Sequence, residues 1–389
     1  MFIKSGVSNW YNEKLRIFTG QQWAGDAAFV DWLALSAGEY WSQQLSNLDL
    51  NMSQSIDGVW LNSNEATNQQ CNGVCYSDQK ATHPNLWKLP YIPTGSNLET
   101  RALPLDALHR DGLTELDLHN LFGTMQTQAT QDWFIEKKNR TMIIGRSSYA
   151  GYGKFGSQWL GDNYSRPDYM GYSVTGTMSH NIAGIPLVGA DICGFIGNTN
   201  AELCARWYMV GAFQPLSRNH NSIGNDPQLP WDFSGVYLKT VTYLDIIKRA
   251  MFTKLSLIRY YYTQMSIVQN EGGAFYKPLF YEYPNDDGAY DNQELNIMIG
   301  PALKLGIQSK SMSISSQFYY PAGRYCEVFC KKETDCCVTY DNGTEITLPS
   351  YAFDYYLDLR AGYIIPMQNA TKIASLDLNV GKNVTTHAL

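Results

Sequence analysis

The sequence has no apolar stretch long enough to span a membrane and no run of lysine and arginine. A transmembrane helix needs about 20 mostly apolar residues. A nucleic-acid surface needs clustered positive charge, whereas this chain of 389 residues carries a formal net charge of −7. We therefore expect no transmembrane segment and no nucleic-acid partner. The sequence also lacks internal repeats and low-complexity segments, which excludes a repeat architecture.

The first residues, MFIKSGVSNW, lack the apolar core of a signal peptide. Eight cysteines and six N-x-S/T sequons are nevertheless typical of an oxidising secretory route. We expect a location in the secretory pathway (lysosomal, extracellular or cell-surface), with no signal peptide in this chain, which would then be part of a longer polypeptide or of a processed precursor. The predicted glycosylation sites are Asn51, Asn139, Asn163, Asn342, Asn369 and Asn383.

The cysteines lie close together in the sequence, which favours local disulfides. They form the groups Cys71/Cys75, Cys193/Cys204 and Cys326, Cys330, Cys336, Cys337. A metal site is the alternative for the last group, but its C-x3-C-x5-CC spacing lacks paired C-x2-C halves and no histidine is near. We expect disulfides there, and neither a metal site nor a cofactor.

Short apolar runs alternate with longer helix-like stretches between Phe29 and about Ser266, a pattern typical of a parallel sheet. Reaction centres of such folds collect at the carboxyl ends of the strands. The predicted strands are 57–62, 114–123, 141–151, 184–195 and 212–221. The predicted helices are 38–48, 126–139, 201–210 and 237–269.

After the glycine pair at 272–273 the pattern changes to short alternating strands, which predicts an antiparallel β-sandwich. The DNG tripeptide at 341–343 is a hairpin signal. We predict a TIM-barrel-type domain over 1–272, the β-sandwich over 273–370, and a further β segment or tail over 371–389.

The segment IDGVWLNSNE, residues 56–65, places a polar burst directly after a brief apolar strand. It resembles the nucleophile motif of glycoside hydrolase family 31, the α-glucosidase family, whose usual form is DGLWIDMNEP. Further segments match in order: LDLHNLFG resembles the family's fifth strand, IIGRSSYAGYGKFGSQWLGDN the sixth with the acid/base loop, GIPLVGADICGF the seventh and FQPLSRNHN the eighth. IMIGPALKLG and LRAGYIIPMQ resemble its proximal β-sandwich.

The resemblance covers almost the whole chain and begins just after the family's third barrel strand. It implies a partial (β/α)8 TIM barrel lacking its first strands, followed by the antiparallel β-sandwich. An open barrel exposes unpaired backbone groups along its edge. We therefore expect another chain, or the missing N-terminal portion, to cover that edge.

By the same resemblance Asp162 is the general acid/base, and Asn62 stands where the family has its nucleophilic aspartate. A retaining glycosidase needs an anionic carboxylate at that position to attack the anomeric carbon. Asn62 supplies neither charge nor a good nucleophile. The neighbouring departures Ser63, Ala66 and Arg166-Pro167 indicate natural drift rather than one engineered substitution.

Arg146 and His220 match residues that hydrogen-bond the sugar, since a guanidinium and an imidazole can donate to hydroxyls. The alternatives are a structural Arg–carboxylate pair and a satisfied loop histidine. Asp191 would order Arg206 or Arg218 or close the pocket floor, and a structural ion pair is the favoured role. Trp60, Trp159 and Phe195 match pocket-lining aromatic positions, with core packing as the alternative.

The sequence thus predicts an α-glucosidase-like retaining glycoside hydrolase acting on α-linked glucose in oligosaccharides or glycans, impaired by Asn62 and by the absent N-terminal strands. The alternative is a pseudoenzyme: a non-catalytic carbohydrate-binding or structural glycoprotein in an extracellular or secretory-pathway assembly.

Overall fold

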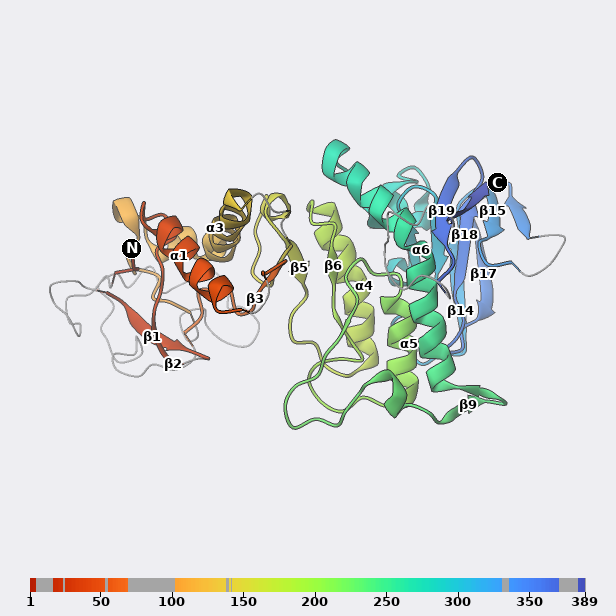
Figure 1. Cartoon of the computed structure of the whole chain (residues 1–389). Coiled ribbons are helices and arrows are strands. Elements are labelled where there is room, and N and C mark those ends of the chain that lie inside the picture. Colours follow the sequence, from red (N-terminus) through yellow and green to blue (C-terminus); the bar gives the residue numbers. More distant parts are fainter. Residues whose placement is uncertain are drawn as a thin grey trace. The chain divides into compact units, whose positions relative to one another are not determined.

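A computed structural model describes most of the chain, in two compact units, Met1–Ser157 and Gln158–Leu389 (Figure 1). The described residues are 1–4, 17–23, 25–52, 55–68, 102–137, 140, 142–330 and 336–370, with the backbone of 384–388. None of the helices in these ranges combines the length and the apolar character needed to cross a membrane.

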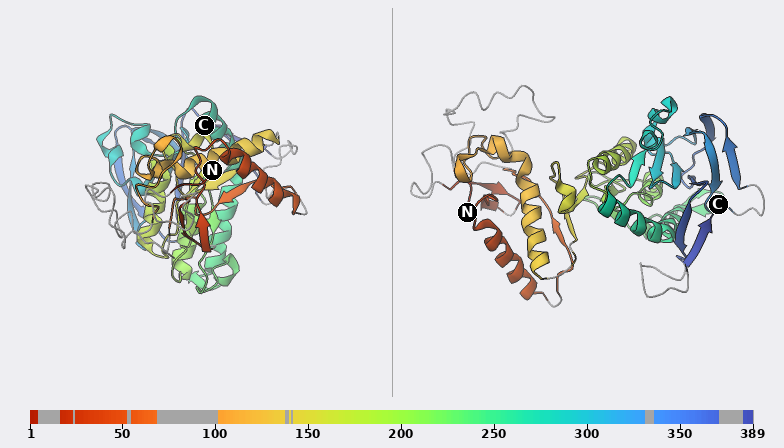
Figure 2. Two further views of the ribbon diagram at one scale, coloured as in Figure 1. Left: turned by 90° about the vertical axis from the view of Figure 1, so that its left-hand side faces the viewer. Right: turned by 90° about the horizontal axis from the view of Figure 1, so that it is seen from above.

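The first unit packs two helices against a pair of parallel strands (Figure 2). Trp41 of α1 donates its indole N–H to the Thr130 hydroxyl of α3 at 2.9 Å, and Trp133 donates to Ser46 at 2.9 Å. Its elements are β1 (Thr19–Gln22), β2 (Gly25–Ala28), α1 (Ala37–Leu50), β3 (Val59–Leu61), α2 (Glu115–Leu118), α3 (Phe122–Glu136) and β4 (Ile143–Gly145). The parallel pair β3–β4 brings the ends of both strands to one edge.

The prediction of a strand over 114–123 is wrong, because this segment is helical. Thr114 and Asp117 form a capping box: the Asp117 carboxylate accepts from the Thr114 backbone N–H at 3.0 Å. The cap starts α2, and a 3-10 turn carries the chain into α3. The apolar residues of LDLHNLFG therefore follow a helical and not an alternating period.

The second unit begins with the parallel strand pairs and the helices that follow them. These are β5 (Ser157–Trp159) with β6 (Val188–Gly189), β7 (Asp191–Ile192) with β8 (Arg218–Asn219), and α4 (Pro167–Ile182), α5 (Ala201–Gly211) and α6 (Tyr243–Glu271). A short hairpin, β9 (Val236–Leu238) and β10 (Val241–Thr242), precedes α6. Among the described strands the pairings do not close a ring, so the chain holds a partial barrel.

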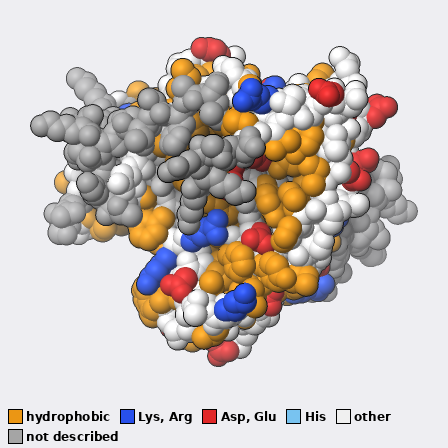
Figure 3. Space-filling model, turned by 90° about the vertical axis from the view of Figure 1, so that its right-hand side faces the viewer, with side chains coloured by type: hydrophobic (Ala, Val, Ile, Leu, Met, Phe, Trp, Pro, Cys, Tyr) orange, Lys and Arg blue, Asp and Glu red, His pale blue; other side chains and the backbone are white. Residues whose placement is uncertain are grey.

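The remaining strands form the antiparallel β-sandwich, which confirms this part of the predicted fold. The main sheet has the order β11 (Tyr276–Pro278), β12 (Asn296–Ile299), β13 (Leu303–Gly306), β18 (Tyr356–Arg360), β15 (Gly323–Glu327), β16 (Cys337–Tyr340). Two further pairs are β14 (Ser315–Tyr320) with β17 (Thr344–Pro349), and β19 (Ile364–Gln368) with β20 (Val384–Ala388). Figure 3 shows broad apolar patches with scattered charges on one face of the molecule, and no gathering of basic side chains there.

The short 3-10 helices connect these elements. They are η3 (Arg110–Gly112), η4 (His119–Leu121), η5 (Tyr152–Lys154), η6 (Pro230–Asp232), η7 (Leu279–Tyr281), η8 (Asp287–Tyr290) and η9 (Gln293–Leu295).

The DNG signal at 341–343 does not make a hairpin. It joins β16 of the main sheet to β17, which pairs with β14 instead. The compact units also differ from the predicted division after residue 272. Helices α4, α5 and α6 share one hydrophobic core with β12, β13, β18 and β19, so barrel-type helices and sandwich strands form one unit.

Three disulfides are local, as predicted. They join Cys193 to Cys204, Cys326 to Cys337 and Cys330 to Cys336. Cys326 and Cys337 are register partners on β15 and β16, so the Cys326–Cys337 disulfide links two neighbouring strands covalently. Cys71 and Cys75 lie outside the described residues.

The predicted glycosylation sites differ in exposure. Asn51, Asn342 and Asn369 are exposed, while Asn139 and Asn383 lie outside the described residues. Asn163 is only 8% exposed, and its side-chain nitrogen donates to the carbonyl oxygen of Asp191 at 2.9 Å. A glycan needs that nitrogen to face solvent, so the structure contradicts the prediction at Asn163.

Candidate active site

The predicted site residues divide between the two units. Trp60, Asn62 and Arg146 lie in the first unit. The second unit carries Trp159, Asp162, Asp191, Phe195 and His220. Asn62, Arg146, Asp162 and His220 follow strand ends, where barrel folds place reacting groups, whereas Asp191 is the first residue of β7.

Asn62 directly follows β3 and is exposed. Two residues later Asn64 is buried, and it fixes the two strand-end loops of this unit. Its side-chain oxygen accepts from the backbone N–H groups of Arg146 at 3.0 Å and Ser147 at 2.8 Å, and its nitrogen donates to the Ser147 carbonyl at 3.1 Å. The position of Asn62 therefore rests on a buried amide that satisfies three backbone groups of the loop after β4.

Arg146 is held by Glu65 in a two-pronged ion pair. Its Nε donates to one carboxylate oxygen at 2.7 Å and a terminal nitrogen donates to the other at 3.1 Å. Both side chains are about a quarter exposed, at 27% and 26%. The structural Arg–carboxylate pair is thus present, and it fixes the plane of the guanidinium beside the strand ends. Glu65 is engaged in this pair, which speaks against its replacing Asn62 as a nucleophile.

A buried ion pair forms the centre of the second group. The Asp191 side chain is fully buried, and its carboxylate oxygen lies 3.2 Å from Nε of Arg218. Burial raises the pKa of Asp191 to about 7, although the positive charge of Arg218 opposes the rise. The Arg218 guanidinium also lies 5.4 Å from the centroid of the Trp159 ring. A buried carboxyl whose pKa lies near 7 and whose neighbours are an arginine and a tryptophan is found both in functional sites and in structural ion pairs.

Of the two arginines predicted as partners for Asp191, Arg218 is the one that pairs. Arg206 instead donates from its guanidinium to the carboxylate of Glu202, four residues earlier on α5, at 3.0 Å. It also donates to the carbonyl oxygen of Ser350 at 2.7 Å. Arg206 therefore links α5 to the sandwich.

The loop that carries Asp162 is attached to the loop after β7. The Asn163 carbonyl accepts from the backbone N–H of Phe195 at 2.8 Å and of Ile196 at 2.9 Å. Gly194 has a φ of 90°, and a Cβ there would come within 2.4 Å of the Ser165 backbone. These contacts hold the exposed Asp162 carboxylate close enough for its charge to add to the burial that raises the pKa of Asp191 and to oppose part of the lowering of the pKa of His220.

His220 stacks on Phe195 with ring centroids 5.1 Å apart and an interplanar angle of 25°. Partial burial, followed by the charge of Arg218, lowers the pKa of His220 below its usual 6.5. The imidazole is therefore largely neutral at pH 7, with one nitrogen to donate and one to accept. This suits hydrogen bonding to a neutral hydroxyl.

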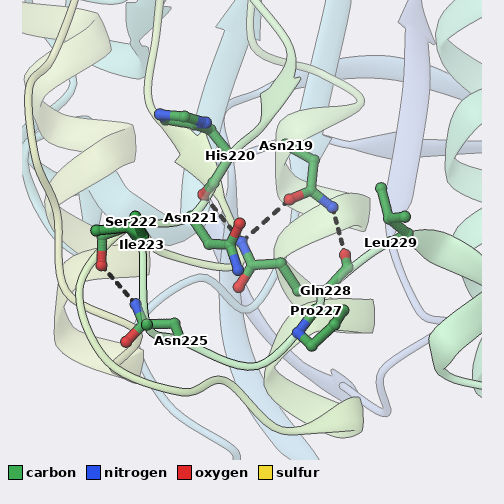
Figure 4. A pocket seen from close by; sticks show the side chains of 10 residues that line it. Asn219, His220, Asn221, Ser222, Ile223, Asn225, Pro227, Gln228 and Leu229 are labelled. Atoms are coloured by element: carbon green, nitrogen blue, oxygen red, sulfur yellow. Dashed lines mark hydrogen bonds between the residues drawn. The ribbon is translucent and has the colours of Figure 1, made fainter.

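Residues 219–225 and 227–229 line an open hollow of about 630 Å³, shown in Figure 4. Gln228 is buried beneath it, and its side-chain nitrogen donates to the His220 carbonyl at 2.9 Å and to the Asn219 side-chain oxygen at 3.0 Å. In Figure 4 the His220 imidazole points away from these amides. Sequence reasoning missed Gln228, and it missed the structural roles of Asn64 and Asn163. Amides in strand-end loops were the available signal, because loop backbone needs side-chain partners.

The sequence model of the "Glycosyl hydrolases family 31 TIM-barrel domain" matches residues 2–264. The chain belongs to glycosyl hydrolase family 31. A probable alpha-glucosidase of Oryza sativa subsp. japonica is 29% identical over 96% of this chain and 40% of that protein. The lysosomal alpha-glucosidase of Bos taurus is 31% identical over 92% and 38%.

The crystal structure of a glucosidase II alpha subunit superposes on this family 31 chain with a TM-score of 0.77. It is 23% identical and covers 98% of this chain and 37% of its own, so the likeness concerns the fold. The chain spans about two fifths of the length of these two curated relatives. The family membership predicted from the motifs is confirmed.

Proposed function

We propose that this chain binds α-linked glucose residues of oligosaccharides or glycans at an α-glucosidase-type site, and that Asn62 impairs hydrolysis there. The observation that carries the proposal is the neutral amide of Asn62 at the end of β3, set in an otherwise ordered framework. Asn64 and the Arg146–Glu65 pair supply that framework in the first unit, and the second unit holds its own ordered pair, Asp191–Arg218.

The chemistry of the retaining mechanism gives the reason for the impairment. Asp162, as general acid, would donate a proton to the leaving oxygen and then, ionised, activate water. The first step also needs an anion that attacks the anomeric carbon and offsets the positive charge developing on the sugar. A carboxamide carries no charge to stabilise that transition state, so the step lacks both its nucleophile and its main electrostatic support.

Binding makes fewer demands than hydrolysis. The Arg146 guanidinium is oriented by Glu65, and the His220 imidazole is presented on Phe195, so both can hydrogen-bond sugar hydroxyls. Asn62 itself can accept and donate. Trp60 and Trp159 would add apolar contact area, although Trp159 is only 4% exposed. We infer that these residues retain affinity for a glucose-sized ligand after hydrolysis is lost.

We place the chain in the secretory pathway and expect a covering partner chain or a further portion of the same protein. The three disulfides support an oxidising compartment. Curated relatives include lysosomal alpha-glucosidases, and one fold neighbour is the catalytic subunit in a heterodimeric ER glucosidase II complex. Isolated 1–389 running as a compact monomer with a cooperative melt would contradict the need for a covering partner.

The decisive experiment measures hydrolysis of 4-nitrophenyl α-glucoside by the chain and by Asn62→Asp, with binding of 1-deoxynojirimycin titrated in parallel. We expect no turnover by the unmodified chain, saturable binding by both proteins, and a gain in rate on the order of 10³-fold or more in the variant. Asp162→Asn in the Asn62→Asp background should remove the gain.

A control for spontaneous deamidation is essential, because Asn62-Ser63 can convert to aspartate on storage. Intact mass and peptide mapping of fresh and aged samples measure this conversion. Turnover by fresh protein whose Asn62 is intact would overturn the impairment, and absence of saturable iminosugar binding would overturn the sugar site.

A further inference from the structure

Three tyrosines form a continuous strip that begins two residues after Asp162. The ring centroids of Tyr164 and Tyr169 are 5.1 Å apart, and those of Tyr169 and Tyr172 are 5.5 Å apart. Tyr164 is 43% exposed and Tyr172 is 62% exposed, while Tyr169 is partly buried between them. The aromatic strip therefore runs from the loop of Asp162 onto the solvent side of α4.

The strip is held in place by its own local structure. Pro167 occupies the first helical position of α4, and the preceding Arg166 makes a two-pronged pair with Asp168 at 3.0 and 2.8 Å. The Arg166 guanidinium lies 5.9 Å from the Tyr169 ring centroid. Tyr169 and Tyr172 are three residues apart on the helix, the spacing at which side chains meet on one face.

The loop end of the strip is fixed to the candidate site. The backbone N–H of Ser165 donates to the Ile196 carbonyl at 2.9 Å, and Tyr164 forms a parallel β-bridge with Ile196. Ile196 follows Phe195, on which His220 stacks. The tyrosine strip is thus continuous with the residues proposed to bind sugar.

The chemistry of the strip favours a neutral sugar chain. Tyrosine offers an apolar ring face and a hydroxyl at its edge, which together match the C–H face and hydroxyls of a pyranose. Arg166 and Asp168 cancel each other's charge, so nothing in the strip selects an anion. A general acid lies on the leaving-group side of the glycosidic bond, and the strip extends from the loop of Asp162.

We propose that Tyr164, Tyr169 and Tyr172 form a subsite for the leaving-side sugars of a neutral α-glucan chain. The inference rests on the proposed function and deepens it: the chain prefers extended glucans to glucose-sized ligands. Tyr172, as the most exposed ring, makes the outermost sugar contact.

The test compares three ligands by titration: 1-deoxynojirimycin, maltose and maltohexaose. We expect the unmodified chain to bind maltohexaose at least about tenfold more tightly than maltose. Tyr172→Ala should weaken maltohexaose binding by about 5- to 10-fold, the range of one lost aromatic contact, and leave 1-deoxynojirimycin binding unchanged. Tyr172→Phe should retain most of the length preference.

Tyr262→Ala is the matched control, because Tyr262 is 45% exposed on α6 and should not affect any of the three ligands. Saturable iminosugar binding without a gain from maltose to maltohexaose would overturn the subsite while leaving the proposed function in place. The subsite would also be overturned if Tyr172→Ala still bound maltohexaose more tightly than maltose to the same degree. It would likewise be overturned if Tyr172→Ala changed self-association in size exclusion instead of ligand binding. If no ligand binds, both the subsite and the proposed function fall.

Discussion

Replacing Lys304 by methionine should stabilise the protein. Lys304 lies on β13 with its side chain fully buried, and its Nζ has no hydrogen-bond partner among the described residues. The ammonium lies 3.7 Å from the centroid of the Tyr320 ring. Asp358, its register partner on β18, is attracted to it but already accepts the Tyr320 hydroxyl at 2.8 Å. The buried ammonium of Lys304 therefore lacks the hydrogen bonds that would offset its loss of hydration.

The magnitude follows from the pKa. Burial, only partly opposed by the charge of Asp358, lowers the pKa of Lys304 from 10.5 to about 7. One pKa unit corresponds to 1.36 kcal/mol, so the cost of burying this amine at pH 7 is about 4 kcal/mol. Methionine fills a similar volume but forfeits the contact of the ammonium with Tyr320, worth about 2 kcal/mol. The difference predicts a net gain of about 2 kcal/mol in the free energy of unfolding.

The gain should depend on pH with a definite sign. Between about pH 7 and 10.5 the unfolded chain holds a proton on Lys304 that the folded chain has released, so the stability of the unmodified protein rises with pH. The advantage of Lys304→Met should shrink by about 1.4 kcal/mol per pH unit above pH 7. Urea unfolding at pH 7, 8 and 9 measures it, with the exposed Lys248→Met as control. A variant less stable than the parent at pH 7, or a pH-independent difference, would refute the reasoning.

Three further predictions concern other buried groups. Desolvation alone would lower the pKa of His109, but Asp31 and Glu115 raise it to about 9. Protonated His109 therefore stabilises the fold by about 3 kcal/mol, fully below pH 6.5 and progressively less as the pH rises through 9. Glu115→Gln should flatten this pH dependence of urea unfolding. Arg218→Met should cost about 3–5 kcal/mol in urea unfolding by leaving Asp191 unpaired, and adding Asp191→Asn should recover most of it. Glycopeptide mapping of secreted protein should find Asn163 unmodified; a glycan there in folded protein would contradict the observed fold.

The alternation of apolar runs predicted β3, β4, the β6–β7 segment and β8, and the helices α1, α3, α5 and α6, because those elements carry their own periodicity. It missed β5 and started α6 six residues early, on the hairpin of β9 and β10. Helix α4 escaped prediction, since Gly171, Gly176 and several Ser and Thr residues weaken its helical signal. Its start is nevertheless encoded, because Pro167 suits the first helical position. The segment 114–123 failed for the opposite reason: its apolar residues fit a strand, and only the Thr114–Asp117 box reveals the helix.

The family motifs predict which residues form the site, but motifs do not encode partners that are distant in sequence. Arg218 and Arg206 were equal candidates for Asp191 until the fold placed Arg218 across from it on β8 and turned Arg206 towards the sandwich. The sequon at Asn163 is likewise a local pattern. Its burial follows from contacts with Asp191 and Phe195, some 30 residues away, which no local pattern reveals.

In the proposed sugar site, the residues that hold the strand-end loops differ from those that would contact the sugar. Asn64 and Asn163 fix the strand-end loops through backbone hydrogen bonds, and neither bond set depends on the side chain at position 62. An aspartate-to-asparagine change at an exposed strand end removes a charge without leaving a buried group unpaired, so its cost in stability is small. Replacing the nucleophilic aspartate by asparagine is therefore compatible with an ordered sugar site. Replacing Asn64 would instead remove the hydrogen bonds that hold the loop of Arg146. This asymmetry supports the proposal that the chain binds sugar without hydrolysing it.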